Sequence, residues 1–411
     1  MKKILFLILI LFFSANSLTV FADDIIDDPI ININELSDIA TSNNITSTPN
    51  INARHAIVID RASETILYGK KETEQCKMAS TTKIMTAIVV IENVKDLSQK
   101  VTISKKSAST GGSRLGLSTN DTITVENLLY GLMMCSGNDA AVALAEFVSN
   151  SVENFSDLMN HKASKLGLKN THFITPHGLD NDDHFTTAYD LAMLTNYALK
   201  NETFSKIVKT KNYTVNINGN PKNLKNTNEL LGNFDGIYGV KTGFTNGANR
   251  CLVTSCKRDN LDIICVVLGC DTKKDRTKDS MELINYTFNN FTIVDIESLI
   301  FNNFNTWKNN HINSFQINKG INSNIDPQID SSTIPYSKIA INNSELNNIT
   351  TPITYTSTFN APLNKSSTIG TLELKIGNQS LFSVTIVNNV AIQKKNFFDY
   401  WLYFFQYSLF Y

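Results

Sequence analysis

Three short motifs follow one another along the chain, and each holds residues that can act on a carbonyl group. Ser80-Thr-Thr-Lys83 comes first, Ser136-Gly-Asn138 follows, and Lys241-Thr-Gly243 comes last. A serine hydroxyl attacks a carbonyl carbon only when a neighbouring group accepts its proton, and a lysine can be that group. Together the three motifs predict a serine acyl-transfer site whose general base is a lysine.

The spacing of Ser80 and Lys83 favours contact between their side chains. The apolar stretch Ile84 to Ile91 follows them and is typical of a buried helix. Residues three apart share one face of a helical turn. A free lysine has a pKa of about 10.4, so a lysine base needs a lower pKa. Burial, the positive helix N-terminus and a second cation such as Lys241 all act in that direction.

The motifs differ in how specific they are. Ser-x-Asn also occurs at Ser14, Ser42 and Ser118, whereas Ser-x-x-Lys and Lys-Thr-Gly each occur once. Any one of these patterns can arise by chance in an unrelated chain. The prediction therefore depends on their order, their spacing and the sequence around them.

That surrounding sequence resembles the serine D-alanyl-D-alanine carboxypeptidases, the low-molecular-weight penicillin-binding proteins. The resemblance rests on Lys77-Met-Ala-Ser-Thr-Thr-Lys-Ile-Met-Thr86, Cys135-Ser-Gly-Asn-Asp-Ala140, Thr175-Pro-His-Gly-Leu-Asp180 and Val240-Lys-Thr-Gly-Phe-Thr245. Penicillin-binding proteins share Ser-x-x-Lys and Lys-Thr-Gly with class A β-lactamases. The similarity runs from about Asn52 to about Phe288, and more faintly to about Lys394.

The resemblance implies a catalytic role for three of these residues. Ser80 is the expected nucleophile and Lys83 its general base. Ser136 is expected to relay a proton toward the leaving D-alanine. The acyl oxygen would rest on the backbone N–H groups of Ser80 and Phe244, which form the expected oxyanion hole.

The resemblance also implies substrate-binding residues. Asn138 is expected to bind the peptide amide, and Lys241 with Thr242 the terminal carboxylate. At Gly243 a side chain would crowd a substrate lying antiparallel to the strand. Arg276 is a further candidate for binding the carboxylate; its alternative is a solvated charged loop, Lys273-Lys-Asp-Arg-Thr-Lys278.

One position departs from the family pattern. Asn249 stands in Gly247-Ala-Asn-Arg250, where relatives usually have a glycine. We expect it to tighten or tilt this turn without touching the nucleophile.

Both ends of the chain indicate export and attachment to a membrane. Two lysines and an apolar run precede Val20-Phe-Ala22, so residues 1–22 are a predicted signal peptide. Residues 396–411 are almost all aromatic or apolar, too few to span a bilayer, and predict an amphipathic helix on the outer face of the cytoplasmic membrane. The alternative is a tail docked on the chain's own second domain.

Between these ends, the length and the composition predict two domains. Residues 23–50 are expected to form a linker and residues 51–292 an α+β domain of the β-lactamase and transpeptidase type. It would combine an antiparallel sheet, with strands at His55 to Asp60, Arg250 to Thr254 and Leu261 to Leu268, with a helical cluster. Residues 296–394 show short alternating stretches and predict a small β-rich domain, which in the family resembles a spacer.

Several classes of site and partner are disfavoured. Removal of the signal peptide leaves 35 basic and 38 acidic residues, so no nucleic-acid binding is expected. The histidines lack metal-ligand spacing, and we expect neither a metal nor a cofactor. The six cysteines are an even number, which permits disulfides, but their apolar surroundings favour buried free thiols.

Three functions compete on this site. A carboxypeptidase would remove the terminal D-alanine from peptidoglycan stem pentapeptides and would bind β-lactam inhibitors. A β-lactamase or a DD-endopeptidase would use the same serine, but no Glu-x-x-Leu-Asn stands between Asn138 and Lys241 to activate a deacylating water as in class A β-lactamases. A non-catalytic wall-binding protein is the third, and the intact motifs argue against it.

Overall fold

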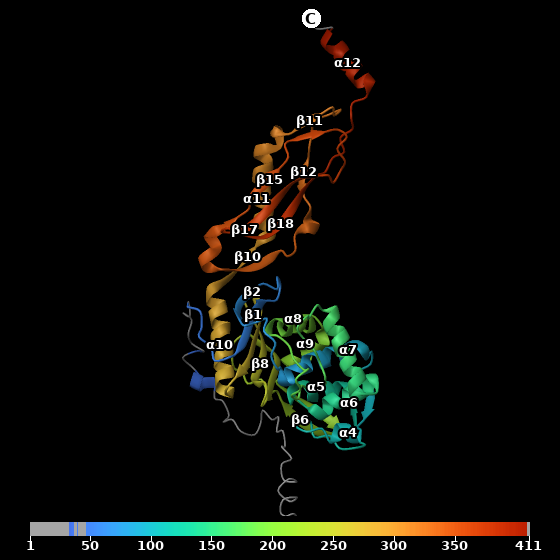
Figure 1. The fold of residues 1–411 in the computed structure, drawn as a ribbon, viewed down its shortest axis with the longest axis vertical. Helices are drawn as coiled ribbons and strands as arrows, with labels where there is room; N and C mark the ends of the chain where they lie inside the picture. Colours follow the sequence, from blue (N-terminus) through green and yellow to red (C-terminus); the bar gives the residue numbers. More distant parts are fainter. Residues whose placement is uncertain (1–32, 37–38, 40–46, 409–411) are drawn as a thin grey trace, which may run out of the picture. The chain divides into compact units, whose positions relative to one another are not determined.

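The chain divides into two compact units, Met1–Asn289 and Asn290–Tyr411 (Figure 1). A computed structural model describes residues 33–36, 39 and 47–408. The expected signal peptide, 1–22, lies outside these residues. Our sequence boundaries, 51–292 and 296–394, put the division between the domains a few residues further along the chain.

The first unit is built on a five-stranded antiparallel sheet in the order β2-β1-β9-β8-β7. Its strands are β1 (His55–Asp60), β2 (Ile66–Lys70), β7 (Ile237–Thr245), β8 (Asn249–Arg258) and β9 (Leu261–Cys270). Nearly every residue of β8 and β9 is buried, because helices cover both faces of the sheet. Helix α10 (Lys273–Asn290) lies on one side and the helical cluster on the other (Figure 1). The β1 strand and the β8–β9 hairpin confirm the strands predicted at these places.

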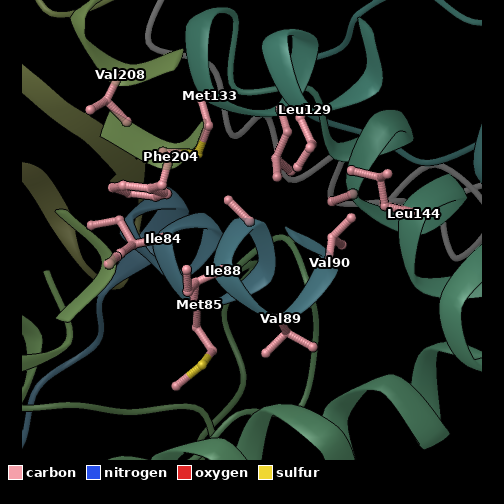
Figure 2. Packing of buried hydrophobic residues seen from close by; sticks show 14 of the residues in the cluster. Ile84, Met85, Ile88, Val89, Val90, Leu129, Met133, Leu144, Phe204 and Val208 are labelled. Atoms are coloured by element: carbon pink, nitrogen blue, oxygen red, sulfur yellow. The ribbon is translucent and has the colours of Figure 1, made fainter. Parts of the chain in front are cut away.

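The helical cluster is organised around one central helix, α3 (Lys83–Asn93). A helix that is apolar on all sides is stable only when other elements surround it. Figure 2 shows Ile84, Ile88 and Val90 of α3 among apolar side chains of the neighbouring helices. These neighbours and the other helices of the cluster are α4 (Lys105–Ala108), α5 (Val125–Met134), α6 (Asn138–Ser149), α7 (Val152–Lys165), α8 (Ala188–Leu199) and α9 (Glu202–Lys209).

Two small two-stranded sheets belong to the same unit. One pairs β3 (Lys100–Thr102) with β4 (Thr122–Thr124), with α4 between them in the chain, and the other is the hairpin of β5 (Asn212–Ile217) and β6 (Asn220–Lys225). The hairpin is tied to the rest of the unit where Lys222 Nζ donates to the carbonyl oxygen of Leu115 at 2.5 Å.

Part of the predicted linker packs on the first unit. Ile33–Leu36 form a 3₁₀ helix in which Ile33 and Leu36 are buried. The Asn285 side chain of α10 donates to the carbonyl oxygen of Ile39 at 2.5 Å. The two apolar side chains explain why this stretch is not a free tether over its whole length.

The second unit is β-rich, as predicted, and contains a long helix that the sequence pattern did not indicate. Helix α11 (Ile296–His311) buries Ile296, Ile300 and Phe304 in the core of this unit. The strands are β10 (Phe291–Asp295), β11 (Gln316–Asn318), β12 (Pro327–Ile329), β13 (Lys338–Asn342), β14 (Ile349–Thr350), β15 (Ile353–Tyr355), β16 (Thr358–Asn360), β17 (Thr368–Ile376) and β18 (Gln379–Asn388). The β17–β18 hairpin is the centre of its largest sheet.

The second unit ends in helix α12 (Phe397–Ser408). The helix begins with a reciprocal cap, in which Asn396 Oδ1 accepts from the N–H of Asp399 and Asp399 Oδ2 accepts from the N–H of Asn396. Its large apolar side chains between Phe397 and Phe405 that the structure describes are 44% to 77% exposed, so they do not pack on the second unit. Within the described residues, no helix combines the length and apolar composition needed to cross a bilayer.

Candidate active site

Ser80 lies in a 3₁₀ turn, Ala79–Thr82, that leads directly into α3. In a 3₁₀ turn, side chains three residues apart eclipse one another. This geometry brings Lys83 Nζ to 2.8 Å from Ser80 Oγ. The sequence placed both residues in the first turn of the helix itself; instead, Ser80 precedes the α-helix and Lys83 is its first residue.

The Lys83 ammonium group is completely buried and has three acceptors around it. Its Nζ atom donates to Ser80 Oγ at 2.8 Å, to Asn138 Oδ1 at 2.7 Å and to the carbonyl oxygen of His177 at 2.8 Å. A neutral amine has two N–H groups and one lone pair. It could keep the bonds to Asn138 and His177 and accept the proton of Ser80, which is the arrangement that a general base requires.

The Ser136-Gly-Asn138 motif forms the entry to α6 on the other side of Lys83. Ser136 is 2% exposed and has a positive φ of 60°. Its Oγ atom has no hydrogen-bond partner among the described residues. Asn138 Nδ2 donates to the carbonyl oxygen of Gly111 at 2.7 Å, so both ends of its side chain are engaged.

Asp139 holds the loop that faces this motif. Its buried carboxylate accepts from the N–H groups of Leu115 at 2.7 Å, Gly116 at 2.7 Å and Leu117 at 3.0 Å. The negative charge is therefore satisfied by the backbone of a loop more than twenty residues earlier. Sequence reasoning missed this residue, although its place next to Asn138 in the motif was a usable signal.

The Lys-Thr-Gly motif lies on the edge strand β7. Lys241 is buried and its Nζ donates to the carbonyl oxygen of Thr242 at 2.9 Å, while Thr242 Oγ1 lies 2.8 Å from Thr227 Oγ1. A Cβ atom at Gly243 would lie 3.1 Å from the backbone nitrogen of Ser80. The close approach that Gly243 permits is therefore with the nucleophile's own turn.

Residues next to the Lys-Thr-Gly motif on β7 and β8 have a specific contact and a specific backbone conformation. The Arg250 guanidinium lies 3.6 Å from the centre of the Phe244 ring, across the strand pair. Asn249, the first residue of β8 after the turn from β7, has a φ of 56°. Asparagine tolerates this left-handed conformation better than most residues, so the position does not require the glycine expected from the family pattern.

Arg276 does not lie in a solvated loop. It lies on α10 rather than in a loop, and its side chain is completely buried. The guanidinium Nη2 lies 2.5 Å from Glu229 Oε1, and Thr277 Oγ1 also donates to that oxygen at 2.6 Å. The solvated-loop interpretation is therefore wrong, and binding of a substrate carboxylate by Arg276 stays a prediction.

A loop that carried no predicted catalytic role touches several parts of the site. The loop from Ile174 to His184, which we name the framing loop, provides the His177 carbonyl oxygen that Lys83 contacts. Asp180 of the same loop accepts from Thr245 Oγ1 at 2.6 Å and from the N–H of Gly247 at 2.9 Å, next to the end of β7. The sequence marked Pro176-His-Gly-Leu-Asp180 only through its resemblance to the family.

The cysteines are thiols. None of the six, all of which lie in the described part of the chain, forms a disulfide. Burial raises the pKa of Cys76 and of Cys256 to about 12 and that of Cys135, which precedes Ser136, to about 11. Thiolates are therefore scarce at neutral pH, which agrees with the predicted buried thiols.

A serine next to a buried lysine, a second serine hydroxyl with no partner among the described residues and an edge strand with a Lys-Thr-Gly motif define a class of protein, the acyl-transferring serine enzymes that share the Ser-x-x-Lys and Lys-Thr-Gly motifs. Comparisons with known proteins identify the family. The model of the S11 peptidases, described as D-alanyl-D-alanine carboxypeptidase, matches residues 42–272. The chain belongs to this family and is a serine D-alanyl-D-alanine carboxypeptidase, as the motifs predicted.

Curated relatives match over most of their length. D-alanyl-D-alanine carboxypeptidase DacF of Bacillus subtilis (strain 168) is 33% identical over 353 residues, which cover 85% of this chain and 88% of the relative. DacC of Escherichia coli (strain K12) is 33% identical over 366 residues, covering 85% and 86%.

Solved structures confirm the fold class. Penicillin-binding protein 5 of Haemophilus influenzae has a TM-score of 0.68 at 26% identity, covering 85% of this chain and 99% of that chain. The Streptomyces K15 DD-transpeptidase has a TM-score of 0.57 at 37% identity and covers 59% of this chain and 99% of its own.

Proposed function

We propose that Ser80 forms the acyl-enzyme and that Lys83 is the base that activates it. The observation that carries this proposal is the 2.8 Å contact between Ser80 Oγ and Lys83 Nζ in a buried site. The neutral amine accepts the hydroxyl proton while Oγ attacks the carbonyl carbon of the penultimate D-alanine. Positioned general bases typically contribute about 100- to 10,000-fold to a rate.

The leaving group departs with a proton. When the C–N bond of the tetrahedral intermediate breaks, the D-alanine nitrogen needs one proton to leave as an amine. The Ser136 hydroxyl, which is buried and unpaired among the described residues, is placed in the motif next to Asn138 and would relay it from Lys83. Water then attacks the carbonyl carbon of the Ser80 ester and passes a proton to Lys83. When the bond between that carbon and Ser80 Oγ breaks, Lys83 returns the proton to Oγ, and the shortened peptide leaves as a carboxylic acid that ionises in solvent.

The edge strand β7 is the proposed binding site for the end of the peptide. Lys241 and Thr242 would hold the terminal carboxylate, and the N–H groups of Ser80 and Phe244 would stabilise the oxyanion. Asn138 would contact the peptide amide and also orient Lys83. Family membership supports a peptidoglycan stem peptide ending in D-alanyl-D-alanine as the substrate, and β-lactams as inhibitors that acylate the same serine.

Mass spectrometry tests this function directly. The purified protein is incubated with diacetyl-lysyl-D-alanyl-D-alanine and, separately, with penicillin. We expect free D-alanine in the first reaction and a long-lived adduct on Ser80 in the second. Ser80→Ala should lose both, whereas the control Ser98→Ala, at an exposed position, should keep both.

Other outcomes would reassign the protein. Rapid turnover of penicillin without a lasting adduct would indicate a β-lactamase, and release of cross-linked peptides in preference to D-alanine would indicate an endopeptidase. An adduct that persists in Ser80→Ala would refute the assignment of the nucleophile. Neither product nor adduct would indicate a non-catalytic wall protein.

We also propose that the exported chain attaches to the outer face of the cytoplasmic membrane through α12. The exposed aromatic side chains of this helix support the proposal, since Trp and Tyr favour the interface of a bilayer. Ile321 and Val390 are 48% and 37% exposed, and the loop of Ile321 pairs with the segment just before α12 through the bridge between Gly320 and Lys394. Lys319 and Lys394 flank these two residues, and Lys365 lies between β16 and β17; their exposed charges suit anionic lipid headgroups.

A further inference from the structure

The carbonyl group of Ala79 is held in a fixed direction by a chain of hydrogen bonds. Thr82 Oγ1 lies 2.8 Å from the Ala79 oxygen and 2.8 Å from His184 Nε2. His184 Nδ1 accepts from the N–H of Ile174 at 2.9 Å. Nδ1 therefore has no proton in the neutral ring, so Nε2 carries it and donates to Thr82, whose own hydroxyl donates to Ala79. Both side chains in this series of hydrogen bonds, Thr82 and His184, are buried.

This carbonyl group belongs to the peptide unit that also contains the N–H of Ser80. In a trans peptide the C=O and N–H groups point in opposite directions. Fixing the Ala79 oxygen on the side of His184 therefore aims the Ser80 N–H to the opposite side. The Gly243 backbone of β7 lies beside that nitrogen, since a Cβ there would come within 3.1 Å of it.

The backbone in this turn needs such support. Ala79 has a φ of 48°, a conformation that non-glycine residues rarely adopt and that costs about 1 kcal/mol or more. Gly178 of the framing loop packs closely against the Ala79 carbonyl group, because a Cβ atom at Gly178 would lie 2.0 Å from the Ala79 oxygen. Without a partner on that oxygen, the peptide unit could rotate toward a more common conformation.

We propose that His184 is a positioning residue for the oxyanion hole, and that it acts through Thr82 and the Ala79 carbonyl on the N–H of Ser80. The inference rests on the proposed acyl-serine mechanism and extends it to a residue outside the three motifs. Its partner is the tetrahedral oxyanion formed from a D-alanyl amide or a β-lactam. His184 also polarises the chain of bonds toward the Ser80 peptide, since linked hydrogen bonds strengthen one another.

Two substitutions of His184 distinguish the roles of its two ring nitrogens. The amide of Gln reaches the position of Nε2 and keeps a donor for Thr82. The amide of Asn reaches only the position of Nδ1, so His184→Asn keeps an acceptor for Ile174 but leaves Thr82 without its donor. At the next link, Thr82→Ser keeps the hydroxyl group and Thr82→Val removes it.

The measurements report how well each variant stabilises the tetrahedral transition state. They are the acylation rate constant with penicillin, kcat and KM with the tripeptide, and the affinity for a peptide boronate that forms a tetrahedral adduct. We expect His184→Asn and Thr82→Val each to lower acylation, kcat and boronate affinity about tenfold, with KM within about twofold. His184→Gln and Thr82→Ser should stay within about threefold of the wild type. The double variant His184→Asn/Thr82→Val should be no slower than Thr82→Val, because both residues act through the same series of hydrogen bonds.

His172→Asn is the matched control. His172 lies just before the framing loop, and its Nδ1 atom lies 2.6 Å from the carbonyl oxygen of Asp183, away from the 3₁₀ turn. Equal losses in His184→Asn and His184→Gln, or a raised KM with unchanged kcat, would overturn the proposal. The proposal would also be overturned if His184→Asn lost activity only because it unfolds at the assay temperature, while Thr82→Val stayed folded and kept its acylation rate. A wild-type protein that forms no adduct on Ser80 would overturn the proposed function and this inference together, whereas wild-type acylation in every variant would overturn the inference alone.

Discussion

The guanidinium Nη2 of Arg276 lies 2.5 Å from the carboxylate Oε1 of Glu229, and the arginine side chain has no exposed surface. Removing one partner of a buried ion pair leaves the other charge without compensation. We therefore expect Arg276→Met to lower the free energy of unfolding by about 3 kcal/mol, measured by urea denaturation.

A companion variant distinguishes this structural role from substrate binding. Arg276→Met combined with Glu229→Gln removes both charges and should recover part of the lost stability. If Arg276→Met folds as stably as the wild type but raises KM for the tripeptide, the arginine instead binds the substrate carboxylate.

Lys83→Arg tests the general base. Arginine keeps the positive charge, but it does not deprotonate in proteins, so it cannot accept the serine proton. We expect kcat/KM for the tripeptide to fall at least about 100-fold, with the fold intact by circular dichroism. Lys165→Arg, at an exposed position on α7, is the control and should keep full activity. A Lys83→Arg variant with near wild-type acylation would exclude lysine as the base.

Asp139→Asn tests the carboxylate that holds the loop beside the motif. An amide nitrogen at this place would face backbone N–H groups that now donate to an oxygen. We expect the free energy of unfolding to fall by roughly 3 kcal/mol. The exposed Asp157→Asn on α7 should leave stability unchanged. Equal melting temperatures for the two variants would contradict the role given to Asp139.

The framing loop predicts a dependence of stability on pH. Burial lowers the pKa of His184 from 6.5 to about 4, with smaller effects of His172, Asp180 and Lys83 nearby. Between these two values the unfolded chain binds a proton that the folded chain does not. The stabilisation is therefore complete above about pH 6.5 and is lost as the pH falls toward 4. His177, whose pKa burial lowers to about 3, acts in the same direction.

His184→Gln isolates this effect because glutamine does not titrate. Between pH 7 and pH 4.5 the wild type should lose more unfolding free energy than the variant, by on the order of 2 kcal/mol. The measurement is urea denaturation at both pH values. Parallel losses in both proteins would show that other groups account for the acid sensitivity.

Helix α12 predicts binding to lipid vesicles by the full chain. The wild type should sediment with vesicles of phosphatidylcholine containing phosphatidylglycerol, and less so at high salt. Replacing Phe397 and Phe404, which are 77% and 70% exposed, by serine should weaken partitioning at least about tenfold. Ile66→Ser, at a 44% exposed position in the first unit, is the control. Unchanged sedimentation of the double variant would contradict attachment through α12.

The sequence predicted the parts of the site that are local in the chain. Ser80 and Lys83 are three residues apart, and the apolar residues after them required a buried helix, so their contact followed from helical geometry. The sequence pattern also identified strands with long apolar stretches, such as β9.

What the sequence did not predict depends on long-range contacts. The bond between His184 and Thr82 joins residues 102 positions apart, and no periodicity relates them. A solvated loop was one of two alternatives for Arg276 because its neighbours are charged, yet the helix turns it toward Glu229. Helix α11 was missed because its many asparagines have low helix propensity, and packing of Ile300 and Phe304 overrides that preference.

The position of Ser80 and Lys83 at the start of the innermost helix has a consequence for how the enzyme loses its activity on heating. Many active sites lie on surface loops that open and close independently of the rest of the fold. Here the backbone amides of α3 can exchange with solvent only when the surrounding helices separate. Heat inactivation and cooperative melting of the first unit should therefore coincide, with no partly melted form that has lost its activity alone.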